Sequence, residues 1–470
     1  MALIATSVAF GTVTKAINPL KIAFNLTNAE VGLIGGVTLW GFAISIVIFG
    51  PLVDAMGMKT QLRVSWVLHL LGSTVMILAA DFWMLFLGGL CIALANGIVE
   101  AACNPLVATL YPDRKTAKLN QFHVWFPGGI AIGALAGFAL ERAGLPDYRL
   151  LLALNLVPAL IYGLLIWGQR FPQTERVQQG VSNAEMFRAT FTRPLFWILL
   201  VCMAMTASLE LGPGRWMTPI LESGGLPGIL ILAYGSILMA VLRYFAGPVV
   251  KRVPPLVLLL ISAIVSGLGL LAVSYSVSLV EAALAATVFY VGVCYFWPTM
   301  LGVTSERIPK GGSLALALMG ASGMLVVGGV TVDLLGVAVD KRADEVLQAD
   351  HARDVARTLN YFGQSLDDPT QTEGLDPETV AEARAAADQV VQQFVADGTL
   401  HPEAASALRY VVAFFPESVD GGNAATLLND AENVGGRAAL RLLTPLAVIL
   451  AVVFGLLFLT QPRRRETPLR

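Results

Sequence analysis

The sequence predicts an all-α membrane protein in which twelve transmembrane helices form two six-helix repeats, with an extra-membrane helical insert between helices 11 and 12. Composition is the first observation behind this prediction. Of 470 residues, 56% are hydrophobic and only 14% are charged, whereas roughly a quarter of a soluble protein is charged. Apolar runs long enough to cross a bilayer as helix, about 18 to 20 residues, recur along the chain. The third observation is an internal repeat.

The twelve apolar runs follow one another with short polar breaks between most of them. The first run has no basic residues before it, and a second apolar run follows closely, which favours a retained helix over a cleaved signal peptide. The predicted helices span residues 2–24, 28–53, 61–80, 82–110, 118–143, 148–169, 193–221, 228–250, 254–274, 277–304, 312–338 and 438–461.

Basic residues are concentrated in every second break. Because Lys and Arg in short loops mark the cytoplasmic side of a membrane, this pattern predicts that both termini are cytoplasmic and that the stretch after the eleventh helix lies outside. We expect a multi-pass protein of the plasma membrane, which in a bacterium is the inner membrane. The residues behind this prediction are Lys59, Arg63, Arg114, Lys115, Lys118, Arg170, Arg176, Arg188, Arg193, Lys251, Arg252, Arg307, Lys310 and Arg463 to Arg465.

The long polar stretch before the last helix is strongly acidic. Between Asp340 and Arg437 there are 18 Asp and Glu against 7 Lys and Arg, a balance of −11, so the rest of the chain carries +9. Asp376-Pro377-Glu378 is typical of a helix start, and His401-Pro402-Glu403 predicts a second helix. Gly421-Gly422-Asn423 predicts a loop. The sequence identifies no partner for this insert.

The two halves of the chain share weak sequence features at a nearly constant offset. Gly50-Pro51 after helix 2 matches Gly247-Pro248 after helix 8, 197 residues later, and Pro105 in helix 4 matches Pro298 in helix 10 at 193 residues. Two homologous halves are a layout associated with transporters. The predicted parts are an N-terminal half (1–170), a linker (171–192), five helices of the second half (193–338), the insert (339–437), and the last helix with a basic tail (438–470).

The loop after helix 2 resembles a family signature. Gly50-Pro51-Leu52-Val53-Asp54-Ala55-Met56-Gly57-Met58-Lys59 is similar to the Gly-x-Leu-x-Asp-x-x-Gly-x-Lys/Arg run between helices 2 and 3 of the major facilitator superfamily. The resemblance implies alternating access between two halves, with Asp54 and Lys59 as gating residues. The family usually has a basic residue where this chain has Ala55, so one gating ion pair of the family has no counterpart at that position.

Helices 4, 5 and 10 resemble the fucose-permease and glucose/galactose branch of that superfamily. Helix 4 carries Glu100-Ala101-Ala102-Cys103-Asn104-Pro105, helix 5 carries Asn120 to Gly129, and helix 10 carries Tyr295-Phe296-Trp297-Pro298-Thr299. The resemblance implies a sugar as the solute and a proton-coupling role for Glu100. Trp297 is a candidate for stacking on a sugar ring, and Arg243 in helix 8 is a weaker candidate site residue.

Polar residues inside the apolar helices are candidate site residues without reference to the family. A charge such as Glu100 costs at least ~2.5 kcal/mol in a bilayer unless it is paired, hydrated or protonated. Asn104 lies one turn along the same helix face, and Asn120 and His123 share a face of the next helix at a similar depth. The alternative interpretation is a purely structural hydrogen-bond cluster.

Helix 1 carries two further candidates, Lys15 and Asn18. Relatives in the fucose-permease branch often have an aspartate near the position of Asn18, which cannot titrate here. Lys15 is a candidate counter-ion for Glu100. Both features leave a uniporter or an exchanger open as alternatives to proton-coupled transport.

Helix 7 carries Glu210 and Arg215 on either side of Gly212-Pro213-Gly214. A Gly-Pro-Gly run removes a helical hydrogen bond and is tolerated in a membrane where it faces protein or a wet cavity. We therefore expect a helix break that serves as a hinge or gate, with Arg215 as a gating residue. The alternative is that Arg215 reaches the outer headgroups.

The remaining motifs exclude other classes. The four cysteines lie in apolar helices without metal-ligand spacing, and no phosphate-binding Gly-rich loop with lysine is present, so we expect no cofactor, no metal and no ATP coupling. Nucleic acid is not an expected partner. The sequence predicts a secondary transporter, not an enzyme, whose partners are the bilayer, a small polar solute, most directly a sugar, and protons. A drug, nucleoside or organic-acid transporter is the alternative, followed by a non-transporting multispan receptor or enzyme.

Overall fold

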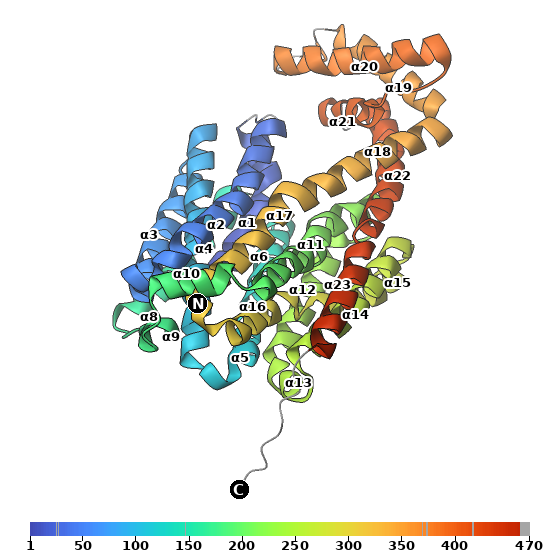
Figure 1. Cartoon of the computed structure of the whole chain (residues 1–470). Coiled ribbons are helices and arrows are strands. Elements are labelled where there is room, and N and C mark those ends of the chain that lie inside the picture. Colours follow the sequence, from blue (N-terminus) through green and yellow to red (C-terminus); the bar gives the residue numbers. More distant parts are fainter. Residues whose placement is uncertain are drawn as a thin grey trace.

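The fold is a bundle of long helices with a helical cap at one end. The computed structural model describes residues 1–24, 26, 28–145, 147–368, 370–372, 375–415 and 418–460, and every regular element within them is a helix. Met1 and the last helix's end lie toward one end of the bundle, and the cap lies at the other (Figure 1). We call these the terminal end and the insert end. The predicted all-α fold is confirmed.

The first half of the bundle contains six spans, and two of them are divided into two helices. Its helices are α1 (Ala2–Ala23), α2 (Asn28–Met56), α3 (Met58–Ile77), α4 (Phe82–Leu110), the short η1 (Pro112–Arg114), α5 (Lys115–Phe122), α6 (Trp125–Arg142), α7 (Tyr148–Ala153) and α8 (Leu156–Trp167). The linker to the second half forms α9 (Glu175–Gln178) and α10 (Asn183–Phe191).

The second half repeats this plan up to its fifth span and then continues into the cap. Its helices are α11 (Pro194–Ser223), α12 (Gly228–Tyr244), α13 (Ala246–Arg252), α14 (Pro255–Tyr275), α15 (Leu279–Val293), α16 (Phe296–Arg307), η2 (Pro309–Gly311), α17 (Gly312–Val326), η3 (Val327–Thr331) and α18 (Val332–Asp350). After the cap, α22 (Val419–Arg441) and α23 (Thr444–Leu459) form the last span.

Most of the twelve predicted spans are apolar and long enough to cross a membrane. Nine helices of the described chain meet that requirement, and the α12–α13 pair, bent by 58°, makes a tenth. The other two spans are α1 and α3, which pack against α6 and α4. Because the chain alternates between the two ends as predicted, the twelve-span architecture is confirmed.

Four of the spans break into two helices for the same chemical reason. In each case a proline is the third residue of the second helix. Proline has no N–H to donate to the carbonyl four residues earlier, but its ring is tolerated in a first helical turn, where N–H groups have no intrahelical partner. At these four positions the preceding helix ends and a new one starts, whereas α2 and α4 continue through Pro51 and Pro105. The four prolines are Pro127 in α6, Pro158 in α8, Pro248 in α13 and Pro298 in α16.

The sequence predicts a break in the seventh span, which is α11, and this prediction is wrong. α11 runs without interruption through Gly212-Pro213-Gly214, because the neighbouring helix packs closely against it. A Cβ on Gly212 would lie 2.8 Å from Thr331 Cγ2. The irregular turn lies instead in that neighbour, where η3 is a π-helix, a distortion often found at functional sites.

The cap is the helical insert that the sequence predicts. It consists of the outer part of α18, then α19 (Ala352–Leu366), α20 (Pro377–Asp397), α21 (Ala404–Phe414) and most of α22, around a hydrophobic core of its own. Asp376 caps α20 as expected, by accepting a hydrogen bond from the Thr379 N–H. The predicted loop at Gly421-Gly422-Asn423 is wrong, since these residues lie in the first turns of α22. Ser418 is the N-cap residue of this helix, and its side chain accepts a hydrogen bond from the Gly421 N–H.

The cap is attached to the second half of the bundle. Asn433 of α22 donates a 3.0 Å hydrogen bond to the carbonyl of Ile220 in α11, and Trp216 of α11 donates one of 3.3 Å to the carbonyl of Val332 in α18. α18 and α22 also pack along each other as an antiparallel pair. The cap therefore extends the last two spans beyond the bundle.

Candidate functional site

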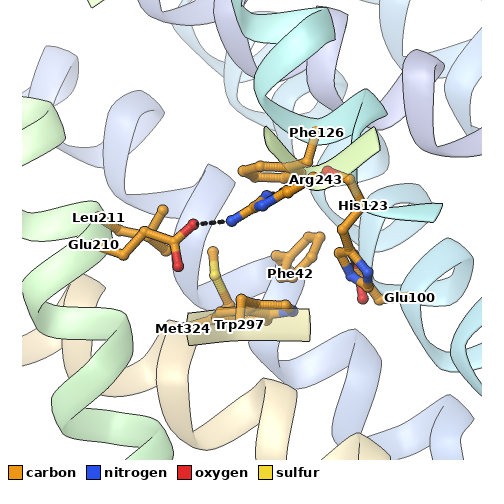
Figure 2. A pocket seen from close by; sticks show the side chains of 9 residues that line it. All are labelled: Phe42, Glu100, His123, Phe126, Glu210, Leu211, Arg243, Trp297 and Met324. Carbon is orange, nitrogen blue, oxygen red and sulfur yellow. Dashed lines mark hydrogen bonds and ion pairs between the residues drawn. The ribbon is translucent and has the colours of Figure 1, made fainter. Parts of the chain in front are cut away.

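A small cavity lined by both charged and apolar side chains lies at the centre of the bundle, between the two halves. Its volume of about 20 Å³ is enough for about one water molecule. Figure 2 shows Glu210 on one side, Glu100 and His123 on the other, and Arg243 between them. The lining residues are Phe42, Glu100, His123, Phe126, Glu210, Leu211, Arg243, Trp297 and Met324.

Glu100 on α4 is the carboxylate that the first half contributes. Its side chain is only 4% exposed. Oε2 accepts a 2.6 Å hydrogen bond from Asn104 Nδ2 one turn along the helix, and Oε1 lies 3.5 Å from His123 Nε2. The structure therefore brings Glu100, Asn104 and His123 together.

The hydrogen-bond pattern of His123 determines which ring nitrogen faces Glu100. Nδ1 of His123 lies 2.9 Å from the carbonyl oxygen of Leu119, which can only accept, so Nδ1 carries a hydrogen. In a neutral ring Nε2 is then an acceptor that faces the Glu100 carboxylate, and two acceptors repel each other. A proton on either group removes this repulsion, as imidazolium beside carboxylate or as carboxylic acid beside imidazole.

The second half contributes the ion pair between Glu210 on α11 and Arg243 on α12. Arg243 Nη2 lies 2.6 Å from Glu210 Oε1, and both side chains are almost fully buried. Among the described residues, Glu210 Oε2 has no hydrogen-bond partner. This oxygen is buried, and the Glu210 carboxylate also lies beside the backbone N–H of Trp297.

A larger cavity extends from this centre to the insert end. Its volume is about 720 Å³, and Glu210, Leu211 and Phe126 line both cavities. We call it the vestibule. Lys15 lines it too, but its ammonium pairs with Glu141 at 3.1 Å. The expectation that Lys15 neutralises Glu100 is therefore wrong.

The terminal end of the bundle is closed by contacts between the two halves. Thr116 Oγ1 of α5 donates a 2.6 Å hydrogen bond to Glu306 of α16, and Asn120 Nδ2 donates one of 3.1 Å to Thr299 Oγ1. Asn120 is thus placed beside the closure and not among the residues that line the central cavity. With the vestibule open and this end closed, the molecule is open toward the insert end.

The predicted gating residues of the loop after helix 2 contact the linker and the end of α8. Asp54 Oδ2 accepts a 2.7 Å hydrogen bond from Arg176 Nε, and Thr174 donates to Oδ1. Lys59 Nζ caps the end of α8 by donating to the carbonyls of Trp167 and Gln169 at 2.9 and 2.6 Å.

Two predicted residues, Asn18 and Arg215, have side chains outside the described part of the structure. Trp297 lines the central cavity as a mostly buried ring. Sequence reasoning ranked Arg243 low and missed Phe42, Phe126 and Met324, because apolar residues in apolar helices carry no distinguishing signal. For Arg243 the available signal was a guanidinium in the middle of an apolar span.

Two helical halves with a cavity between them and an opening at one end are the arrangement expected of a membrane transport protein. Comparison with known proteins identifies its family. The family model "Major Facilitator Superfamily" matches residues 1–331. The chain therefore belongs to the major facilitator superfamily, and it is a transporter, not an enzyme.

Solved structures of this superfamily share the fold. FucP, a major facilitator superfamily transporter in the outward conformation, is 20% identical with a TM-score of 0.56, covering 72% of this chain and 91% of that one. A bacterial homologue of the human lysosomal transporter Spinster, in an inward-facing conformation, is 15% identical with a TM-score of 0.61, covering 97% and 94%.

Curated relatives match over shorter stretches. The facilitated glucose transporter member 10 of Xenopus laevis is 25% identical over 159 residues, which are 33% of this chain and 28% of that protein. The gentisate transporter of Corynebacterium glutamicum is 24% identical over 284 residues, 56% of this chain and 62% of that one. The chain thus spans less than two thirds of the length of either relative.

Proposed function

We propose that this protein moves an uncharged, hydroxyl-rich solute of the sugar class across the membrane by alternating access, together with a proton. The observation that carries the proposal is the position of Glu210, a buried carboxylate that lines both the vestibule and the central cavity. A solute in the vestibule would meet Glu210 first, while Glu100 and His123 line only the central cavity behind it.

The charges of the site favour an uncharged solute. Two carboxylates face one guanidinium and one imidazole in the central cavity, so the site has no surplus of positive charge for an anion. Carboxylates accept hydrogen bonds from hydroxyl groups. The rings of Phe126 and Trp297 add apolar faces of the kind that stack on sugars.

The proton would bind between Glu100 and His123. The two side chains are separated from the vestibule by a cavity that holds about one water molecule, so a proton can reach them while a sugar cannot. They lie 3.5 Å apart, so a small approach of the two side chains would bring them within hydrogen-bond distance. A change of charge this deep in the membrane would favour a conformational change, because an unpaired charge there has a high free energy.

Transport in the cell would run between the outer face and the cytoplasm. Lys and Arg lie in every second break between the spans, and this pattern supports cytoplasmic termini. With that orientation the insert and the open vestibule would face the outside. The linker contacts of Asp54 with Arg176 would stabilise the closed terminal end. In this role Asp54 is a gating residue even though Ala55 replaces the usual basic residue of the family.

An organic acid is the second candidate solute. The relatives named gentisate transporter and cis,cis-muconate transport protein match 56% and 44% of this chain, whereas the facilitated glucose transporter member 10 of Xenopus laevis matches 33%. Arg243 would be the anion-binding residue, but its charge is already balanced by Glu210 at 2.6 Å.

Solute exchange in liposomes tests the proposal. Purified protein is reconstituted with an unlabelled solute inside, and entry of the labelled solute is measured without any gradient, for hexoses, pentoses, gentisate and muconate. We expect exchange of at least one sugar, reduced in Glu210→Gln, which loses a charge at the proposed contact. Exchange of the carboxylates alone would show that the solute class is wrong.

A further inference from the structure

Arg243 is the largest fully buried side chain of the described residues, with 1% exposure. Burial of a guanidinium is tolerated only when its N–H groups are paired. Arg243 has three partners: Glu210 Oε1 at 2.6 Å, the carbonyl of Cys294 at 2.6 Å from Nε, and the carbonyl of His123 at 3.2 Å from Nη1. The last of these belongs to the other half of the bundle.

The two carbonyl partners are available because of proline. A helix carbonyl normally accepts from the N–H four residues later, and for His123 and Cys294 these residues are Pro127 and Pro298, which have no N–H. α5 ends just before His123, and α15 ends just before Cys294. Arg243 thus contacts the carbonyls at two helix breaks, one in each half. The carbonyl of His123 also accepts a 3.3 Å hydrogen bond from the Phe126 N–H.

His123 extends this connection to the proton site. Its carbonyl accepts from Arg243, and its ring faces Glu100 at 3.5 Å. Arg243 therefore touches the backbone of the residue whose side chain forms the proton site, and at the same time the carboxylate that faces the vestibule. Figure 2 shows Arg243 between these two groups.

We propose that Arg243 is the positioning residue that couples proton binding at Glu100 and His123 in one half to solute binding at Glu210 in the other. The inference rests on the proposed function. A hydroxyl that donates to Glu210 draws charge away from the Glu210–Arg243 pair, and Arg243 then shifts its hydrogen bonding toward the two carbonyls. This shift moves the backbone of His123, and with it the distance from Nε2 to Glu100.

Other titratable groups near the cluster are few. Cys103 lies one turn from Glu100 on α4, Cys294 supplies one carbonyl, and Tyr295 follows it with its hydroxyl on the carbonyl of Leu242. Thiols and phenols keep their protons at neutral pH. The connection therefore depends on Glu100, His123 and Glu210.

The test compares two measurements on the same full-length protein in liposomes. The first is solute exchange without a gradient, and the second is accumulation driven by an inward proton gradient. Arg243→Lys keeps the cation beside Glu210 but loses the planar fork that reaches both carbonyls. We expect the ratio of driven accumulation to exchange to fall by about tenfold, a typical coupling between two sites.

Two further variants make the result specific. Tyr295→Phe removes a 3.1 Å hydrogen bond to the same helix, α12, without touching the connection, and should keep the wild-type ratio. The double variant with Glu210→Gln and Arg243→Gln removes both partners of the ion pair, so no unpaired charge is left buried and misfolding is less of a risk. Its ratio of driven accumulation to exchange should fall as it does in Arg243→Lys.

An unchanged ratio in either Arg243 variant would overturn the inference, as would an equal loss in Tyr295→Phe. If the wild-type protein exchanges gentisate or muconate and no sugar, the proposed solute class is wrong. The ratio of driven accumulation to exchange, measured with that carboxylate, then shows whether Arg243 couples the two sites.

Discussion

Replacing Gly302 by alanine should open the terminal end of the bundle. Gly302 of α16 lies against Thr116 of α5, and a Cβ at this position would be 2.3 Å from Thr116 Oγ1 and 2.7 Å from its Cα. The second contact is with backbone, so a side-chain rotation cannot relieve it. The two halves must separate at this point, which is the closure between them.

The size of the effect follows from the cost of overpacking. An extra methyl group in a well-packed contact costs about 1–3 kcal/mol. Because the contact exists only when the terminal end is closed, the penalty falls on that state alone. It should shift the ratio of closed to open molecules by about 5- to 150-fold.

The assay is the distance between spin labels on the two halves, introduced by Arg114→Cys and Lys251→Cys at exposed positions of the terminal end. Gly302→Ala should add a population with a longer separation. Gly247→Ala is the matched control, since a Cβ there would meet only Gln121 Nε2 at 3.8 Å. A folded Gly302→Ala protein with the wild-type distance distribution would refute the reasoning.

Two further predictions concern stability. Gly129→Ala should lower the unfolding free energy by about 1–3 kcal/mol, because a Cβ would lie 1.9 Å from Ser7 Oγ; thermal unfolding in detergent checks this against Gly128→Ala, and equal midpoints would contradict it. Burial raises the pKa of Asp344 to about 6, so the folded cap binds this proton more tightly than the unfolded chain does. Its stability should therefore increase as the pH falls from about 6 to about 4, by about 1 kcal/mol after allowance for partial exposure. Hydrogen exchange of α21, whose Ala405 N–H donates to Asp344, should show this gain in the wild-type protein and not in Asp344→Asn; a gain of the same size in both would count against it.

Much of the architecture could be predicted from the sequence because hydrophobic length determines the spans. The twelve apolar runs, the repeat and the start of α20 at Asp376 follow from local patterns. The predicted break at Gly212-Pro213-Gly214 was wrong because tertiary packing decides whether a helix with proline continues. The distortion instead falls in Val327–Thr331, which contains Gly328 and Gly329 but no proline.

The candidate site could be predicted only in its first half. Glu100, Asn104 and His123 lie within two consecutive spans, so helical geometry and depth were enough to place them together. The pairing of Lys15 with Glu141 depends on how α1 packs against α6, and the pairing of Arg243 with Glu210 on how α12 packs against α11. Such long-range contacts leave no trace in spacing along the chain.

The central claim, that solute and proton move together, is tested most directly by the pH inside sugar-exchanging proteoliposomes. A pH-sensitive dye is trapped in the lumen and a sugar gradient is imposed from outside. The account predicts that sugar entry acidifies the lumen, and that Glu100→Gln, which removes the shared proton site with His123, abolishes the acidification while sugar still exchanges. Sugar entry without acidification in the wild-type protein, or unchanged acidification in Glu100→Gln, would contradict it.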